Sequence, residues 1–589
     1  MGTRRGGFAS LGGAGSIRGS AGVLKERANM SFMLVVMFFA VFGLIVLTEI
    51  FLIDERRSNG GNGALGGHRQ GHGRLAPAPD RPDYEEVAVE DYVGLKGGFD
   101  AQIGMLIKDD KIKKSSSIIS SKNDIINLTP NIELQLPQLD QNIRQTSGEW
   151  LPVTNTRFKF YVYSAYYDDR IITSTTNKKY NSKYDKINNN NYNKGLIRII
   201  GATKTRTPDR VWCRLWYTQI NNSTTTNNTT KSITVPAKIK AIRENWNLKY
   251  SACFIICQLP KVIDNSNNTI PESVSIVSKL KIQPTNRLKI QNRPDERPAV
   301  RQSLGICVKP LHYNYNRVLQ LVEFIELHKI LGTAHVTLYN DTVGDEASCV
   351  LKYYEAKGVV SILPWHKLDM ISQREIRTEG LFAALNDCLY RSMYKYDFVA
   401  LLDLDEFIIP RHNDTIIDLI QWMSSKVNIK SGGSFSFQNA FFYLQWPDDP
   451  WVTTSKTEAE AGLITLRKTR RKSKLHPHKQ RSKYICKPRD VVEAGNHFVW
   501  EFLPGHGTLN VLADHAILHH YRVCEFGGDD CVKTPSVIDR TAYKYRDKLT
   551  KTINNIWSDL DNNCQLPKLQ PVPVLSPLVP SSPDQIPTR

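Results

Sequence analysis

The sequence lacks the cysteine spacing of a zinc-binding module. No two cysteines are separated by two residues, and the close pairs Cys253/Cys257 and Cys524/Cys531 have no neighbouring partner pair. An RNA-binding aromatic signature is also missing, although the formal net charge of the 589 residues is +19. Residues 467–489 concentrate this charge, with eleven Lys or Arg side chains and no acid. A nucleic-acid groove would use such a stripe. Without any other nucleic-acid module, we interpret it as a solvated loop or a surface drawn to phosphate or acidic glycans.

Charge itself is missing from residues 31–48, and apolar character resumes after Glu49 up to residue 53. About 20 apolar residues at 1.5 Å each span a bilayer core. Lys and Arg outnumber acids before this run, which places the N-terminus in the cytosol. A cleaved signal peptide is the alternative, but no convincing small-residue cleavage site follows. We therefore expect a cytosolic tail at 1–29, a transmembrane signal anchor at 30–53, and a single-pass type II protein of the Golgi or ER/Golgi membrane.

None of the ten cysteines precedes the expected anchor. An even number of cysteines in an oxidising compartment indicates disulfides, whose pairing the sequence leaves open. N-glycosylation sequons, for example at Asn340 and Asn413, agree with a lumenal location.

The chain between the anchor and residue 298 falls into two parts. Residues 54–148 show no sustained periodicity, and we interpret them as a stem. Residues 149–298 carry four segments rich in β-branched and aromatic side chains, which predict a β-rich accessory domain of unassigned role. These segments are 158–170, 196–202, 211–217 and 250–259. The Asn-rich tracts between them, such as 174–193, are interpreted as loop insertions.

Strands and helices alternate from residue 304 onward. The expected strands are 304–309, 335–340, 359–365 and 398–410, and the expected helices are 317–332, 346–358 and 374–396. This alternation predicts an α/β domain with a parallel sheet covered by helices. Ligands of such sheets bind beyond the carboxyl ends of the strands. The Pro-rich segment 564–589 is expected to be a disordered tail.

Asp403, Asp405 and Glu406 follow the apolar run of the last expected strand. Strand alternation would place Asp403 and Asp405 on the same face. Paired carboxylates repel each other unless a cation neutralises them, and a hard divalent ion such as Mg²⁺ or Mn²⁺ fits oxygen ligands. The motif therefore predicts a metal–diphosphate site, with a solvated acidic turn as the alternative.

Six segments, in this order and spacing, resemble glycosyltransferase family 92. They are 307–315, 323–341, 385–391, 401–410, 483–491 and 516–523. The resemblance places a family 92 domain at 299–563 and implies a GT-A-type, Rossmann-like fold that binds a nucleotide sugar. It implies hexose transfer from a UDP-sugar with Mn²⁺ (or Mg²⁺), as in the family's β-1,4-galactosyltransferases that use UDP-galactose. The acceptor would be an N-glycan or another glycoconjugate.

Carried over residue by residue, the resemblance gives Asp403 and Asp405 the metal and diphosphate, and His520 a further place on the metal. Asp387 would touch the nucleotide or sugar, or else be a surface acid at a helix C-terminus. Lys487 and Arg522 would balance phosphate charge, although surface roles stay open for both.

Inverting transfer also requires a carboxylate that accepts the proton of the acceptor hydroxyl. Asp449 and Glu501 are the candidates that the sequence offers for this base. We expect the basic block 467–489 to form a loop near the donor or acceptor groove, ordered by substrate. A non-catalytic lumenal lectin or scaffold that retains the fold is the alternative function.

Overall fold

The computed structural model describes residues 128–140, 142–170, 195–219, 229–260, 270–426, 429–524 and 531–573. The expected tail 1–29, the anchor 30–53 and the Asn-rich tract 174–193 lie outside the described residues. Within the described ranges, no helix combines the length and the apolar character that a membrane crossing requires.

The β-rich region forms a closed sheet. Its strands follow the order β1-β2-β3-β6-β5-β4-β7-β8, and β8 also pairs with β2, so the sheet closes into a barrel. The barrel is filled by alternating apolar side chains, among them Ile197, Leu215 and Ile255, which are all fully buried. The predicted β-rich region is thereby confirmed. The strands are β1 (Leu151–Pro152), β2 (Tyr161–Asp168), β3 (Leu196–Lys204), β4 (Trp212–Gln219), β5 (Thr229–Ala241), β6 (Tyr250–Gln258), β7 (Ser273–Val277) and β8 (Leu288–Gln291).

The end of the expected stem packs on this barrel. The short helix α3 (Pro130–Glu133) places the carboxylate of Glu133 against Thr234, whose hydroxyl donates to it at 3.1 Å. Leu136 is buried beside Trp212. A stem boundary at residue 148 is therefore wrong, because residues from 128 onward already contribute to the packed region.

The α/β region is built on a seven-stranded sheet of order β11-β10-β9-β12-β17-β14-β20. The first four strands are parallel, as predicted, whereas β17 runs antiparallel to both β12 and β14. The strands are β9 (Gln302–Leu311), β10 (His335–Asn340), β11 (Val360–Pro364), β12 (Tyr396–Leu402), β14 (Gly432–Phe437), β17 (Lys483–Cys486) and β20 (Gly507–Asn510).

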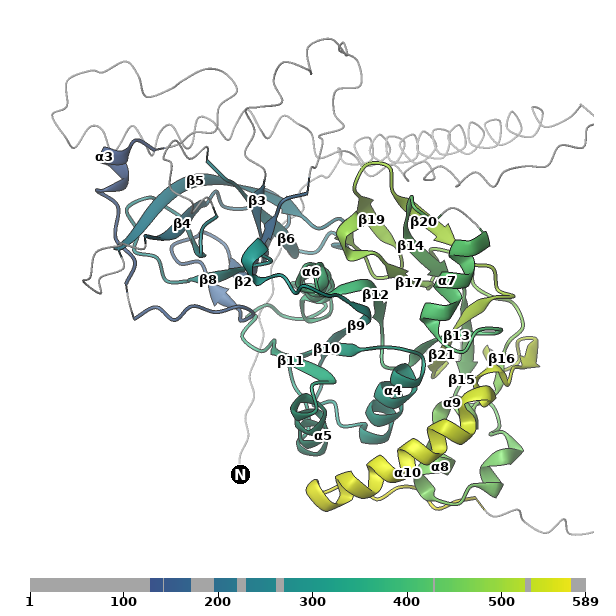
Figure 1. The fold of residues 1–589 in the computed structure, drawn as a ribbon. Coiled ribbons are helices and arrows are strands. Elements are labelled where there is room, and N and C mark those ends of the chain that lie inside the picture. The colour runs from purple at the N-terminus through teal and green to yellow at the C-terminus, as the bar shows by residue number, and fades with distance from the viewer. Residues whose placement is uncertain are drawn as a thin grey trace, which may run out of the picture. The chain divides into compact units, whose positions relative to one another are not determined.

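Helices cover both faces of the parallel strands (Figure 1). Along β9, Leu304 and Ile306 belong to the core that also holds α4 and α5, while Cys307 belongs to the core that holds α6. The expected helix 374–396 is shorter, because its first part is a turn. The helices are α4 (Val318–Ile330), α5 (Asp345–Ala356), α6 (Leu381–Ser392), α7 (Ile416–Lys426), α8 (Glu458–Gly462), α9 (Ile464–Arg467) and α10 (Arg546–Asn563), with 3-10 turns η1 (Pro294–Glu296), η2 (Thr378–Gly380), η3 (Pro450–Thr454), η4 (Pro488–Asp490) and η6 (Thr541–Tyr545).

Helix α6 also joins the barrel to the α/β region. Eleven of its residues are buried. Leu385 and Tyr390 share one apolar core with Trp150, Tyr163 and Phe254 from the barrel side. The two regions thus form a continuous packed body across α6.

Three smaller sheets complete the described part. The expected strand 398–410 is in fact two strands, because the chain leaves the seven-stranded sheet after Leu402 and enters a three-stranded sheet at Glu406. The three-stranded sheet has the order β13-β21-β15. Its strands, and those of the two-stranded sheets, are β13 (Glu406–Pro410), β15 (Asn439–Tyr443), β21 (Ala516–Arg522), β16 (Arg470–Lys472), β22 (Ser536–Ile538), β18 (Val491–Ala494) and β19 (Val499–Phe502).

Disulfides are present, as the cysteine count indicated. The pairs are Cys213–Cys257, Cys307–Cys388, Cys349–Cys564 and Cys524–Cys531. Cys253 and Cys486 are free and buried. The third bond ties the end of α10 to α5, and Leu566 and Leu569 pack partly buried against the core. The expected tail therefore begins too early at residue 564, while residues 574–589 lie outside the described part.

Candidate functional site

The acidic motif lies in a turn at the carboxyl end of β12, between two sheets. The Glu406 N–H donates to the Asp403 carbonyl at 3.1 Å, and the Asp403 N–H donates to the Glu406 carboxylate at 3.0 Å. The Asp405 carbonyl accepts from the N–H of Tyr521 in β21 at 2.9 Å. These bonds fix the turn from both sides. Asp403 and Asp405 are therefore held by a turn rather than by strand alternation.

Two lysines neutralise Asp403. Lys309, near the carboxyl end of β9, donates to Asp403 Oδ2, and Lys483 of β17 lies 3.3 Å from the same oxygen. Lys483 is 2% exposed and also lies 3.2 Å from Glu406 Oε2. Burial alone would raise the pKa of Asp403, but the charges of the two lysines outweigh it and hold the pKa well below the ordinary value. Asp403 is thus a carboxylate at neutral pH.

His520 faces the same turn from β21, directly opposite Glu406. Its Nε2 lies 3.4 Å from Asp405 Oδ2, and its Nδ1 lies 3.3 Å from Glu406 Oε1. Burial lowers the pKa of His520, but the charge of Glu406 and the contact with Asp405 outweigh it and raise the pKa above the ordinary value. Burial also raises the pKa of Glu406, and the charge of Lys483 offsets this effect only in part. The structure therefore brings Asp403, Asp405 and His520 together.

A pocket of about 420 Å³ opens beside this turn. Its wall is largely the loop that follows β9, in which Tyr313 and Asn314 adopt left-handed backbone conformations with φ of 58° and 52°. Such conformations are unfavourable for residues with a side chain and gather at functional sites. The lining residues are His312, Tyr313, Asn314, Tyr315, Asn316, Arg317, Gln320, Leu404 and Asp405.

The donor atoms at the turn fit a divalent cation in kind. Asp403 Oδ1 is buried and, among the described residues, has no hydrogen-bond partner, while the Asp405 side chain is 32% exposed at the pocket. Carboxylate oxygens are preferred ligands of Mg²⁺ and Mn²⁺, and imidazole is a less preferred ligand of Mn²⁺. Across the described ranges, however, no three His, Cys, Asp or Glu side chains are already arranged as a metal-ligand set. The residues could hold a metal, and the assignment stays a prediction.

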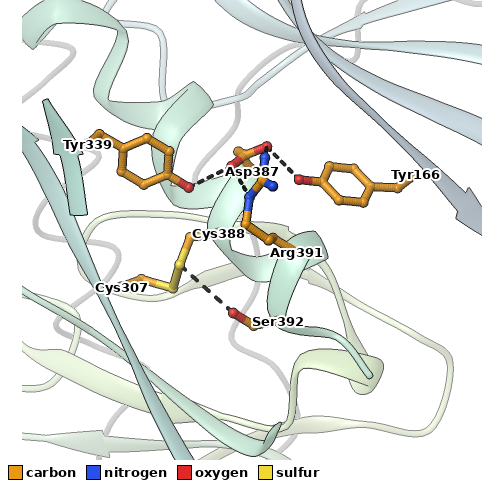
Figure 2. Close-up of a disulfide and its surroundings, with 7 residues drawn as sticks. All are labelled: Tyr166, Cys307, Tyr339, Asp387, Cys388, Arg391 and Ser392. Atoms are coloured by element: carbon orange, nitrogen blue, oxygen red, sulfur yellow. Dashed lines mark hydrogen bonds and ion pairs between the residues drawn. A yellow bond between two sulfur atoms is a disulfide. The ribbon is translucent and has the colours of Figure 1, made fainter. Parts of the chain in front are cut away.

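Asp387 is completely buried in α6 (Figure 2). Its carboxylate accepts from the hydroxyls of Tyr166 and Tyr339 at 2.5 and 2.7 Å, from Ser164, and from the guanidinium of Arg391 at 3.0 Å. The alternative of a surface acid at a helix C-terminus is wrong, because the side chain is enclosed on all sides. A contact with nucleotide or sugar would require these four partners to move, so the geometry favours a structural role.

The two candidate bases are both engaged in structural contacts. Asp449 begins η3, where it accepts from Trp451 N at 3.1 Å, and it also accepts from Thr469 Oγ1 at 2.7 Å and Arg540 Nε at 2.8 Å. Glu501 pairs with Lys240 Nζ at 2.6 Å and so ties β19 to the barrel. Burial raises the pKa of each carboxyl, but these partners outweigh it and lower both values. The assignment of a base stays a prediction for each.

Lys487 and Arg522 lie outside the pocket lining. The Lys487 ammonium donates to the Ile429 carbonyl at 2.9 Å, and burial lowers its pKa. The Arg522 guanidinium lies 5.3 Å from the centre of the Phe441 ring. Of the predicted site residues, Asp405 alone is among the described residues that line the pocket.

The basic block 467–489 forms strands and ion pairs within the folded domain and is not a solvated loop. Arg467 pairs with Asp448 at 2.7 Å, and Arg471 pairs with Asp539 at 2.8 Å. The block also supplies β16 and β17, so its interpretation as a loop ordered only by substrate is wrong for these residues. Lys483 shows why basic composition did not mean solvent exposure: a lysine can be buried when two carboxylates compensate its charge.

Sequence reasoning missed Lys309, Lys483, His312 and Glu379. Lys309 and His312 could have been found, because both flank the carboxyl end of the first parallel strand, where ligands bind. Lys483 is hidden within a basic run whose composition suggests solvent. Glu379 lies just before α6, and nothing in the local pattern indicates that it approaches His312.

Comparison with known proteins identifies the α/β region. The family described as Glycosyltransferase family 92 matches residues 302–566. Glycosyltransferase family 92 protein F13G3.3 of Caenorhabditis elegans is 30% identical over 129 residues, which are 20% of this chain and 25% of that protein. Beta-1,4-galactosyltransferase galt-1 of the same organism is 27% identical over 175 residues, which are 28% of this chain and 40% of that protein. The chain therefore matches well under half of the length of these relatives.

Solved structures give only distant likenesses. Glucosyl-3-phosphoglycerate synthase from Mycobacterium tuberculosis, in complex with Mn²⁺ and UDP-glucose, is 10% identical with a TM-score of 0.20, covering 45% of this chain and 80% of that one. S. aureus TarS 1-349 in complex with UDP is 11% identical with a TM-score of 0.22, covering 43% and 71%. Similarity at this level carries no argument about the present site.

Proposed function

Residues 302–566 form a domain of glycosyltransferase family 92, and from this premise we propose that the protein transfers a hexose from a UDP-sugar to a glycan. The proposed fold type is GT-A and the proposed mechanism is metal-dependent and inverting. UDP-galactose is the proposed donor, because one relative is named a β-1,4-galactosyltransferase. Mn²⁺ is the proposed metal, with Mg²⁺ as the nearest substitute.

One observation carries this proposal. The Asp403–Glu406 turn follows a buried parallel strand and presents Asp405 to a pocket of about 420 Å³. Crevices at the carboxyl ends of such strands are where α/β proteins bind nucleotides. A carboxylate cluster at this place suits a metal–diphosphate and would repel a bare anion. The turn therefore supports a nucleotide-diphosphate donor.

The side chains at the turn suit the charge changes of glycosyl transfer. A bound divalent metal would stabilise the negative charge that develops on the departing diphosphate. Asp403, Asp405 and His520 would hold it. Lys309, whose side chain is 24% exposed beside Asp403, would face the same diphosphate and add a positive charge. Asp449 and Glu501 stay the sequence-based candidates for the base that an inverting transfer requires.

The proposed location is the Golgi membrane, with type II topology and a lumenal catalytic domain. The charge-free segment 31–48 with its basic N-terminal flank supports an anchor. Four disulfides in the described part support an oxidising compartment.

A non-catalytic lumenal scaffold is the second candidate function. The specific observation in its favour is that two lysines balance the charge of Asp403 without a metal. A family fold that has lost its chemistry would be expected to retain such an internal pair.

Turnover decides between the two candidates. The purified full chain would be tested for UDP release from a panel of UDP-sugars with glycan acceptors, in Mn²⁺ or EDTA. Asp405→Asn is the site variant, and Asp397→Asn is the matched control, because Asp397 lies in an exposed ion pair with Arg301. Metal-dependent turnover of one donor that only Asp405→Asn abolishes supports the transferase. Absence of both turnover and UDP binding in the wild type would leave the scaffold.

A further inference from the structure

The segment just before α6 has an unusual backbone. Thr378, Glu379 and Gly380 are three consecutive left-handed residues, with φ of 41°, 47° and 76°. The φ of Gly380 favours glycine at this position, and a Cβ there would also lie 2.9 Å from Leu368 Cδ2. Residues with a side chain disfavour this conformation, so surrounding contacts must impose it.

Those contacts hold Glu379 firmly. The indole N–H of Trp365 donates to the Glu379 carbonyl at 2.5 Å, and the Glu379 N–H donates to Ser372 Oγ at 3.3 Å. Trp365 is fully buried and follows β11 directly. The segment is therefore braced by the carboxyl edge of the parallel sheet, and its backbone aims the Glu379 side chain in a set direction.

The Glu379 carboxylate points toward His312 without bonding to it. Its Oε2 lies 3.7 Å from His312 Nε2, beyond hydrogen-bond distance, and its side chain is 13% exposed. Both Glu379 Oε2 and His312 Nδ1 are buried and have no hydrogen-bond partner within the described residues. Buried polar atoms of folded proteins are nearly always paired, so an orphan pair requires an explanation.

The separation of 3.7 Å is wider than that of the buried pair in which Arg170 Nε lies 2.8 Å from Asp168 Oδ1. Asp341, after β10, adds a further acid to the cluster: burial raises its pKa, and the charge of Glu379 raises it further. Glu379, which lies on the left-handed segment and has an unpartnered carboxylate oxygen, is suited to a ligand that supplies hydroxyl donors.

His312, and not Glu379 itself, lines the pocket, so His312 connects Glu379 to it. His312 lines the same pocket as Asp405. If the acidic turn holds the diphosphate of the donor, the sugar attached to that diphosphate must lie in or beside this pocket. We propose that Glu379, with His312 beside it, accepts hydrogen bonds from hydroxyl groups of the sugar that is transferred, and so helps to select the donor. This inference rests on the proposed function and adds a sugar-recognition residue to it.

The test separates sugar recognition from nucleotide binding. Affinities of the full chain for UDP and for UDP-galactose, both with Mn²⁺, would be measured by calorimetry for wild type and Glu379→Gln. The control is Glu375→Gln on the same segment, whose carboxylate is engaged by Lys159 Nζ at 3.2 Å and Ile371 N at 3.0 Å. We expect Glu379→Gln to weaken UDP-galactose binding roughly tenfold or more, because a hydrogen bond to a charged group contributes about that factor. UDP binding should change less than about twofold, the precision of such a titration.

Each other outcome overturns the inference. Equal weakening of both ligands by Glu379→Gln would assign Glu379 to the fold or the nucleotide. If the wild type binds both ligands and Glu379→Gln keeps the same preference for UDP-galactose over UDP, the sugar-recognition role is overturned and the proposed function stands. A wild type that binds neither ligand would overturn both.

Discussion

Removal of the Asp387 carboxylate is the perturbation with the most definite consequence. Asp387→Ala would take the shared acceptor away from Tyr166, Tyr339 and Arg391, which reach it from the barrel, from β10 and from α6 itself (Figure 2). The substitution therefore acts where the barrel and the α/β region meet.

The expected magnitude follows from the charge left behind. Arg391 is 11% exposed and would lose its carboxylate partner, keeping Gln291 and the Ser147 carbonyl as acceptors. Breaking a buried pair by removing one partner costs about 3–5 kcal/mol. Asp387→Asn keeps the volume and one acceptor oxygen, so it should cost less, about 1.5–3 kcal/mol for the lost charge-assisted bond.

Denaturant unfolding of the full chain, followed by tryptophan fluorescence, would measure both losses. Asp397→Ala is the control, because its pair with Arg301 is exposed and contributes about 0–1 kcal/mol. A loss below about 1 kcal/mol for Asp387→Ala would refute the structural reasoning. A stable Asp387→Asn that no longer binds UDP would restore the alternative in which Asp387 touches the nucleotide.

Three further predictions concern other parts of the fold. Serine at both Cys307 and Cys388, which close a separation of 81 residues, should lower stability by about 4.5 kcal/mol in the chain-entropy model, and an unchanged unfolding midpoint would contradict this. Burial raises the pKa of Glu323 to about 7, although hydrogen bonds from the Thr465 side chain and N–H and from the Ile464 N–H act to lower it. Between pH 4.5 and 7 the folded state therefore binds more protons than the unfolded state. The free energy of unfolding of the wild type therefore falls as pH rises through this window. Because Gln does not ionise, the free energy of unfolding of Glu323→Gln should rise relative to that of the wild type by on the order of 3 kcal/mol across the window. Parallel dependence of the two unfolding free energies on pH would exclude this. Lys309→Met removes the cation that competes for Asp403, so Mn²⁺ should bind more tightly without nucleotide, on the order of fivefold by electron paramagnetic resonance of free Mn²⁺, and weaker binding would oppose it.

Local periodicity was sufficient for the first helix and the second strand of the α/β region. The helix expected at 317–332 is α4 (Val318–Ile330), and the strand expected at 335–340 is β10 with the same bounds. Apolar side chains of both elements pack in the same core. The rule that ligands bind beyond the carboxyl ends of parallel strands also placed the acidic motif correctly next to the pocket.

Periodicity failed where packing decides the structure. The run 398–410 is apolar on both sides of Asp403, Asp405 and Glu406, and the turn bonds of Asp403 and Glu406 divide it into β12 and β13. Closure of the barrel depends on pairing between β2 and β8, which are distant in sequence. No local pattern contains such a contact.

Charged residues were the hardest to place. Asp387 and Lys483 both belong to types that are usually exposed. Each is buried here because partners from distant segments compensate its charge: Arg391 and two tyrosines for Asp387, and Asp403 with Glu406 for Lys483. Sequence shows the charge but not the partner, so it predicted solvent or ligand contacts for both residues.

The most direct test of the central claim is UDP binding to the purified full chain, by calorimetry, in Mn²⁺ and in EDTA. The account predicts binding that requires the metal and that is lost in the double variant Asp403→Asn, Asp405→Asn, while Asp397→Asn binds as the wild type does. UDP binding that depends on neither the metal nor these two carboxylates would contradict the assignment of the turn after β12 as the donor site.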